Sequence, residues 1–159
     1  MRLGHKSSAA LMALATLAAS LAWLSGGTPA SASGTVRITA AYYDPHPGPD
    51  PSTNAARNLE YIVIRNSGSK AIALTGYVLH DTPRAGSTNR FVFPRFTLKP
   101  GKSVRVHTGS GTNTAADLYW RRTFYVWGDD ADTATLQMKS GRTASRCSWT
   151  ATSSSPKFC

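Results

Sequence analysis

The chain has 159 residues and is strongly basic, with 18 lysines and arginines against 8 aspartates and glutamates and a formal net charge of +10. This length fits one domain with a real hydrophobic core, and no repeat or linker points to a second domain. The charge favours contact with polyanions such as nucleic acid, anionic lipid or acidic wall polymers, without choosing among them. A basic surface that only keeps the protein soluble explains the charge equally well.

The N-terminal segment has the plan of a secretory signal peptide. Arg2 and Lys6 give a positive start, residues 9–24 form an apolar run, and an Ala-Ser-Ala cleavage pattern follows. A retained membrane anchor is the alternative, but the run has 16 residues, fewer than the roughly 20 that span a bilayer. We therefore expect a signal peptide at 1–32 and a secreted, extracellular domain at 33–159 with no transmembrane anchor after cleavage. Losing Arg2 and Lys6 leaves 16 basic and 8 acidic residues, a net charge of +8.

The rest of the chain is predicted to be all-β. Apolar residues alternate with period two, so that Phe91 and Phe93 share one strand face and Val104 and Val106 share another. The eight expected strands lie at 36–41, 60–66, 72–81, 89–98, 102–108, 123–127, 132–139 and 142–149. Short antiparallel strands of this kind close into a sandwich or barrel. The segment 44–58 carries four prolines, so we expect it to be an ordered loop.

Two cysteines, Cys147 and Cys159, are the only ones in the chain. An even count in an exported protein suggests a disulfide. An intramolecular bond would tie the C-terminus to the last strand and contribute about 3 kcal/mol in the chain-entropy model. Intermolecular pairing and free thiols remain the alternatives.

The glycine-rich stretch HTGSGTNTAADLYW at 107–120 raises the question of a phosphate cradle. Such a cradle needs a glycine turn that opens a helix. Here an aromatic, β-rich sequence follows, without the Gly-Lys-Ser/Thr that a P-loop requires. The sequence therefore does not support a phosphate cradle. The glycines of the stretch permit positive φ, and residues 112–114 can satisfy their own backbone groups.

No catalytic constellation is visible in the sequence. There is no Gly-x-Ser-x-Gly elbow, and Glu60 is the only glutamate, without an obvious carboxylate partner for glycoside hydrolysis. His46, His80 and His107 are 34 and 27 residues apart, so they form no local metal-ligand pair. We expect no enzymatic activity and no small-molecule substrate.

Two further clusters are candidate sites. The aspartates at 129, 130 and 132 resemble part of a calcium loop, but no glycine and glutamate follow at EF-hand spacing. Acidic turns also need nothing bound, so no metal and no cofactor are predicted. Arg121 and Arg122 form the tightest basic cluster and lie among aromatic residues, which makes them the candidate contact for an anion or a nucleic acid. In a β-sandwich, however, such rings more often belong to the core.

Several motifs in this order resemble the lamin tail domain in its bacterial, secreted form. They are ITAAYYDPHPGPD at 38–50, NLEYIVIRNSG at 58–68, ALTGYVLHD at 73–81, FVFPRFTLKPGKSVRVHTGSGTNTAADLYW at 91–120 and VWGDDADTATLQMKSGR at 126–142. The resemblance implies an immunoglobulin-like β-sandwich of about eight short, mainly antiparallel strands, without enzymatic activity of its own. It also implies that the glycine-rich stretch is a connection, which Leu118 and Trp120 anchor to the core.

These observations favour a secreted, non-catalytic binding or adhesion module. The expected partner is an anionic wall polymer, a lipid surface or a protein, and the expected state is a monomer. Extracellular nucleic-acid binding through Arg121 and Arg122 is the first alternative. A structural role through self-association, by strand edges or by exchanged disulfides, is the second.

Overall fold

The structure is a computed structural model that describes Met1 and residues 35–46, 48–81 and 89–159. The described part holds eleven strands and one short helix. These are β1 (Val36–Tyr42), α1 (Asn54–Arg57), β2 (Tyr61–Asn66), β3 (Ile72–Ala73), β4 (Val78–His80), β5 (Arg90–Val92), β6 (Thr97–Leu98), β7 (Ser103–His107), β8 (Asp117–Tyr119), β9 (Asp132–Gln137), β10 (Thr143–Trp149) and β11 (Lys157–Phe158). Within these ranges, no helix combines the length and the apolar character needed to cross a membrane.

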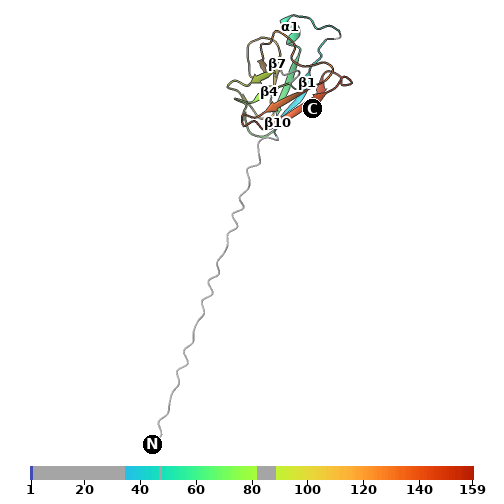
Figure 1. The fold of residues 1–159 in the computed structure, drawn as a ribbon. Coiled ribbons are helices and arrows are strands. Elements are labelled where there is room, and N and C mark those ends of the chain that lie inside the picture. The colour runs from blue at the N-terminus through green and yellow to red at the C-terminus, as the bar shows by residue number, and fades with distance from the viewer. Residues whose placement is uncertain (2–34, 47, 82–88) are drawn as a thin grey trace. The chain divides into compact units, whose positions relative to one another are not determined.

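Two sheets pack face to face into a β-sandwich, as predicted (Figure 1). One has five strands in the order β11-β1-β2-β7-β8, and the other has four in the order β10-β9-β4-β5. A short third sheet pairs β3 with β6. Most neighbours are antiparallel, but β7 and β8 run parallel. The sheets are also linked at their edges, where the Ile38 N–H of β1 donates a hydrogen bond to Ser145 Oγ of β10 (3.1 Å).

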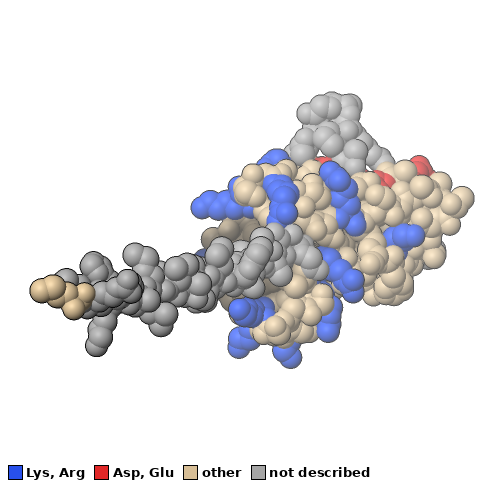
Figure 2. All heavy atoms as spheres, turned by 90° about the horizontal axis from the view of Figure 1, so that it is seen from below, with Lys and Arg blue, Asp and Glu red and all other residues tan. Residues whose placement is uncertain are grey.

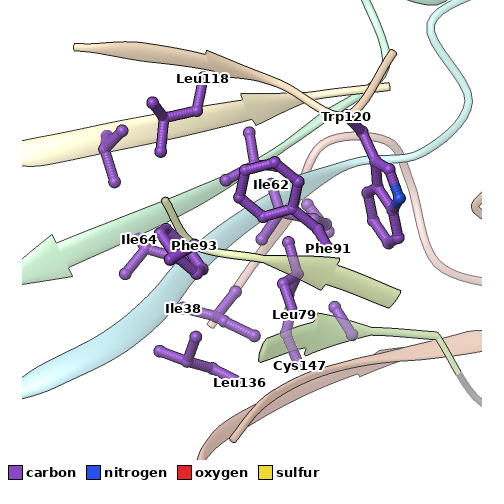
Figure 3. Close-up of a cluster of buried hydrophobic side chains, with 14 of the residues drawn as sticks. Ile38, Ile62, Ile64, Leu79, Phe91, Phe93, Leu118, Trp120, Leu136 and Cys147 are labelled. Atoms are coloured by element: carbon purple, nitrogen blue, oxygen red, sulfur yellow. The ribbon is translucent and has the colours of Figure 1, made fainter. Parts of the chain in front are cut away.

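The core lies between the sheets and follows the period-two alternation of the strands (Figure 3). Val104 and Val106 of β7 are both fully buried, as the sequence predicts. Phe91 and Phe93 also point inward and pack edge to face at 5.0 Å, whereas Val92 between them is 59% exposed. Each such buried side chain stabilises the fold by roughly 1.5–3 kcal/mol, which makes this alternation the main driving force for the sandwich.

Two of the predicted strands are each divided in the structure. The stretch 72–81 is interrupted by a turn in which the Tyr77 N–H donates to the Leu74 carbonyl (2.8 Å) and Gly76 has a φ of +79°. The stretch 89–98 is divided around Pro94, which has no N–H for a ladder. The prediction of eight strands was therefore too low.

The predicted strand at 123–127 was wrong. The N–H groups of Val126 and Trp127 donate to a side-chain carboxylate, Glu60 Oε1, instead of to a neighbouring strand. The strand that the pattern missed is β8, which lies earlier in the chain. The Trp120 N–H donates to the His107 carbonyl of β7 (2.8 Å) and extends this pairing beyond β8.

The proline-rich loop at 44–58 contains no strand among its described residues, as predicted, but it does contain the single turn α1. Thr53 caps this turn, because its Oγ1 accepts a hydrogen bond from the Ala56 N–H (3.1 Å). A threonine before a short alanine-containing segment was the signal in the sequence. One turn is too short to show helical periodicity, so the helix was not predicted.

The predicted disulfide joins Cys147 to Cys159 within the chain, with 5.7 Å between the Cα atoms. Cys147 belongs to β10 of the four-stranded sheet, whereas β11 just before Cys159 pairs with β1 of the five-stranded sheet. The Cys159 N–H donates to the carbonyl of Thr39, which lies in the β1 bulge (3.0 Å). The bond therefore joins the two sheets at one edge. The predicted signal peptide at 1–32 lies, apart from Met1, outside the described residues.

Candidate functional site

The glycine-rich loop is held in place by residues around α1. Asn54 Oδ1 accepts a hydrogen bond from the Ser110 N–H (2.7 Å), and Asn54 Nδ2 donates to the Ser110 carbonyl (2.9 Å). Asn58 Nδ2 donates to the same carbonyl (3.0 Å). The backbone of Ser110 is thus engaged on both sides, and Leu118 and Trp120 are buried below it. The loop is a connection, as predicted.

The two glycines of this loop are required by the close approach of neighbouring side chains. Gly109 and Gly111 do not adopt positive φ. Instead, a Cβ at Gly109 would lie 2.8 Å from Asn54 Oδ1, and one at Gly111 would lie 2.5 Å from the Tyr119 ring. Both positions need glycine because neighbouring side chains approach the backbone closely. Asn113 Oδ1 accepts from the Tyr119 N–H (3.1 Å), a backbone group of β8 rather than its own.

Glu60 places a carboxyl group inside the core. Its Oε1 accepts hydrogen bonds from Thr108 Oγ1, from the Val126 N–H (2.9 Å) and from the Trp127 N–H (3.4 Å). Burial raises the pKa of Glu60 to about 8, against the opposing effect of these hydrogen bonds. The side chain has no exposure to solvent. Its position and partners indicate that it fixes the segment before β9 rather than contacting a ligand.

The raised pKa of Glu60 makes stability depend on pH. The folded protein holds the proton more tightly than the unfolded chain, whose pKa is the ordinary 4.5. The stabilising contribution is therefore complete below the ordinary value and is lost as pH rises toward about 8. Between these limits the free energy of unfolding should fall more steeply for the native protein than for Glu60→Gln, which stays neutral. Urea unfolding of both proteins across this range measures the difference, and parallel profiles would contradict the assignment.

Four ring side chains form a row across the outer face of the five-stranded sheet. Tyr42, Tyr61, His107 and Tyr119 occupy paired positions on β1, β2, β7 and β8. Their ring centroids are 4.3, 5.0 and 5.0 Å apart in that order. Because the rings stack mainly on one another, and Gly111 lies against the Tyr119 ring, their faces are largely occupied. The row stabilises the sheet through cross-strand pairs.

Asp117 joins this row to the charged residues of the same face. It accepts hydrogen bonds from Arg105 Nε (2.7 Å) and His107 Nε2 (2.9 Å). Burial alone would raise the pKa of Asp117, but the bonds from His107 and Arg105 outweigh it and lower the pKa. The other ring nitrogen of His107 lies 2.7 Å from the Asn58 carbonyl. Both nitrogens of His107 are thus engaged within the fold.

His80, Asp81 and Asp132 also have partners within the fold. His80 Nδ1 lies 2.9 Å from the Asp81 carbonyl, and the Asp81 carboxylate accepts from the Asn89 N–H (2.9 Å). Asp132 accepts from the Gly128 N–H (3.1 Å) and from the Thr133 N–H (2.6 Å), as a turn aspartate does. Within the part of the chain that the structure describes, no three His, Cys, Asp or Glu side chains are placed to hold a metal ion.

Of the two adjacent arginines, Arg122 lies beside aromatic rings. The Arg122 guanidinium is 5.8 Å from the Trp120 ring and 5.6 Å from the Phe124 ring. Trp120 is 8% exposed and belongs to the core, as the sequence analysis favoured, whereas Phe124 is 49% exposed. Arg121 is exposed, with an unusual φ of 64°. The tryptophan is therefore hidden from any base, and the half-exposed Phe124 is already faced by Arg122.

A second group of cations gathers at the end of the sandwich where β1 begins and β2 ends. The side chain of Asn66 is buried at this end, and its Nδ2 donates to the carbonyls of Lys70 (2.8 Å) and Leu98 (3.0 Å). The Asn66 N–H donates to the Lys102 carbonyl (3.0 Å). We call this region the basic end and define it by Arg37, Arg65, Lys70, Lys99, Lys102, Lys139 and Arg142. The basic end was not predicted from the sequence, because its residues come from four separate segments.

Several of the acidic residues are buried, paired or placed at the far end of β1. Glu60, Asp81 and Asp132 are buried. Asp44 follows the far end of β1. The pKa of Tyr43 beside it is raised mainly by burial, and the charges of Asp44 and Asp129 raise it further. In the view of Figure 2, lysines and arginines dominate the charged surface and acidic side chains are visible only near its margin. The two ion pairs between described residues both use Asp117. The basic end therefore presents positive charge to solvent.

Two open hollows are present on the described surface. The first, about 290 Å³, is lined by Thr97, Leu98, Lys99, Lys102, Ser103, Ala115 and Ala116. The second, about 330 Å³, is lined by Tyr42, Asp44, Pro45, Leu59, Tyr61, Ser155 and Pro156. The first belongs to the basic end, and the second adjoins the row of rings.

The fold defines the class of the protein as an immunoglobulin-like β-sandwich, with long connections and charged surfaces outside its core. A family model for the Lamin Tail Domain matches residues 29–151. This match covers most of the chain, so the protein belongs to the lamin tail domain family, a family of non-enzymatic immunoglobulin-like domains. A search among curated proteins found no match. Residues 152–159, which include β11 and Cys159, lie beyond the family match.

Proposed function

We propose that the protein is an exported, non-catalytic binding module that contacts an anionic extracellular or cell-envelope polymer through its basic end. The observation that carries this proposal is the separation of charge. Cations of the segments 65–70 and 99–102 lie around Asn66, which bonds both segments, while several acidic residues are buried or paired with Arg105 and His107. A surface of one sign attracts polymers of the opposite sign and accelerates their association. The signal-peptide pattern at 1–32 supports an extracellular location.

Retention on isolated cell wall, measured across a salt series, tests the proposal. The native protein should bind at low ionic strength and elute as salt rises, because salt screens contacts between exposed charges. The double variant Arg65→Glu/Lys70→Glu should elute at clearly lower salt. The matched control is Arg90→Glu/Arg146→Glu, which makes the same change of charge on exposed residues of the four-stranded sheet. Equal elution of the two double variants would show that net charge, and not the basic end, governs retention, and no retention of the native protein would refute the function.

Nucleic-acid binding through Arg121 and Arg122 is less well supported. Base stacking needs exposed rings, yet Trp120 and Trp127 are 8% and 2% exposed. Two results together would favour nucleic acid over wall polymer as the ligand. The native protein would have to bind single-stranded DNA more tightly than wall polymer, and Arg121→Ala/Arg122→Ala would have to lose this binding.

A further inference from the structure

The hollow at the basic end has the composition of an anion site. We propose that it binds one phosphodiester group of a polymer whose repeat is aliphatic, such as an alditol phosphate. This inference rests on the proposed function and assigns a specific site to it. Nothing acidic lines the hollow, whereas Lys99 and Lys102 contribute two cations and Thr97 and Ser103 contribute two hydroxyl groups. Ammonium and hydroxyl donors together make the charge-assisted hydrogen bonds that phosphate oxygens accept.

The wall of the hollow that bears the lysines is fixed before any ligand binds. Lys99 and Lys102 lie at the two ends of a tight turn, in which the Lys102 N–H donates to the Lys99 carbonyl (3.2 Å). Gly101 in this turn has a φ of +67° and donates its N–H to the buried Asn66 carbonyl (2.9 Å). The backbone of the turn is therefore anchored to the end of β2, which reduces the entropy lost on binding.

The opposite wall is equally well defined. The Ala116 carbonyl accepts a hydrogen bond from the Arg105 N–H of β7 (2.8 Å), and the Ala116 N–H donates to Thr114 Oγ1 (3.1 Å). Ala115 and Ala116 have small side chains, so they leave the space between the two walls open. A larger residue at Ala116 would fill this space without changing any charge.

The lining also indicates which kind of phosphodiester fits. No aromatic side chain is among the lining residues, so the hollow lacks the rings on which nucleic-acid bases stack. Its uncharged surface comes from Leu98 and the two alanines. This surface suits the carbon atoms of an alditol or sugar repeat that lies beside the phosphate. The volume of about 290 Å³ is sufficient for one small repeat unit.

Titration of the whole secreted protein with poly(glycerol phosphate), followed by amide NMR shifts and by calorimetry, tests the site. The shifts should concentrate at residues 97–103 and 115–116. Lys99→Gln/Lys102→Gln should lower the affinity about tenfold at constant salt. The control Lys139→Gln/Arg142→Gln removes two charges from the basic end outside the hollow, and should lower it by no more than about threefold. Ala116→Leu should weaken binding with no change of charge.

The outcomes separate this inference from the proposed function. Native binding that persists in the lysine double variant and in Ala116→Leu, with shifts elsewhere on the basic end, overturns the site and leaves the function standing. If the native protein binds neither isolated cell wall nor poly(glycerol phosphate), the function and the site are both overturned. Equal affinity of the hollow for a single-stranded DNA oligonucleotide, with the same dependence on Lys99 and Lys102, overturns the assignment of an aliphatic repeat.

Discussion

Replacing Glu60 with alanine is expected to lower the free energy of unfolding by roughly 3–6 kcal/mol. The substitution leaves the Val126 and Trp127 N–H groups and the Thr108 hydroxyl in the core without their acceptor, and each buried donor without a partner costs roughly 1–3 kcal/mol. A domain of this size has a total stability of about 5–15 kcal/mol. The variant should therefore be marginal or unfolded in urea titrations followed by tryptophan fluorescence.

The matched control for this prediction is Glu60→Gln. Its amide oxygen can accept the same hydrogen bonds while its charge is absent at every pH. It should therefore unfold close to the native protein at low pH and be the more stable of the two near pH 8, the raised pKa of Glu60. An alanine variant that loses less than about 1 kcal/mol would show that Glu60 does not organise the segment before β9.

Removing the disulfide through Cys159→Ser is expected to cost about 3 kcal/mol. The two cysteines are 12 residues apart in sequence, and their bond holds β11 beside β1. Changing Cys159, which is exposed, keeps the buried Cys147 in the core and so avoids a cavity. Urea unfolding with and without reductant measures the effect: reductant should bring the native protein to the stability of the variant and leave the variant unchanged.

Cys147→Ala provides the comparison for this second prediction. It should lose more stability than Cys159→Ser, because it removes the same bond and also a buried sulfur atom. Both variants should keep their wall binding when folded, since neither residue belongs to the basic end. A native protein that reductant does not destabilise would contradict the assigned role of the bond.

The alternation of apolar residues predicted the sandwich and much of its core. Phe91, Phe93, Val104 and Val106 point inward as expected, because a strand places alternate side chains on opposite faces and burial selects one of them. The disulfide was also predictable, since the chain has only two cysteines. The β-rich sequence after the glycine-rich stretch argued against a phosphate cradle, and the resemblance to the lamin tail domain implied that the stretch is a connection.

The candidate site was much less predictable. Arg121 and Arg122 are adjacent in sequence and were therefore selected, but one of them packs on buried Trp120. Lys70 and Lys102 are 32 residues apart, and they meet only because Asn66 binds both segments. A Lys-Pro-Gly-Lys turn was visible at 99–102. Nothing local indicated which segments would surround it.

The sequence by itself determined the class of fold, the strand faces, the cysteine pair and the basic balance, because each depends on local alternation or on composition. Only the tertiary structure determined which groups the backbone N–H groups and the charged side chains contact. Val126 and Trp127 have the composition of a strand, yet they donate to Glu60, more than sixty residues away. The lysines of the basic end likewise meet through hydrogen bonds between distant segments. Such contacts depend on chain topology, which neighbouring residues do not encode.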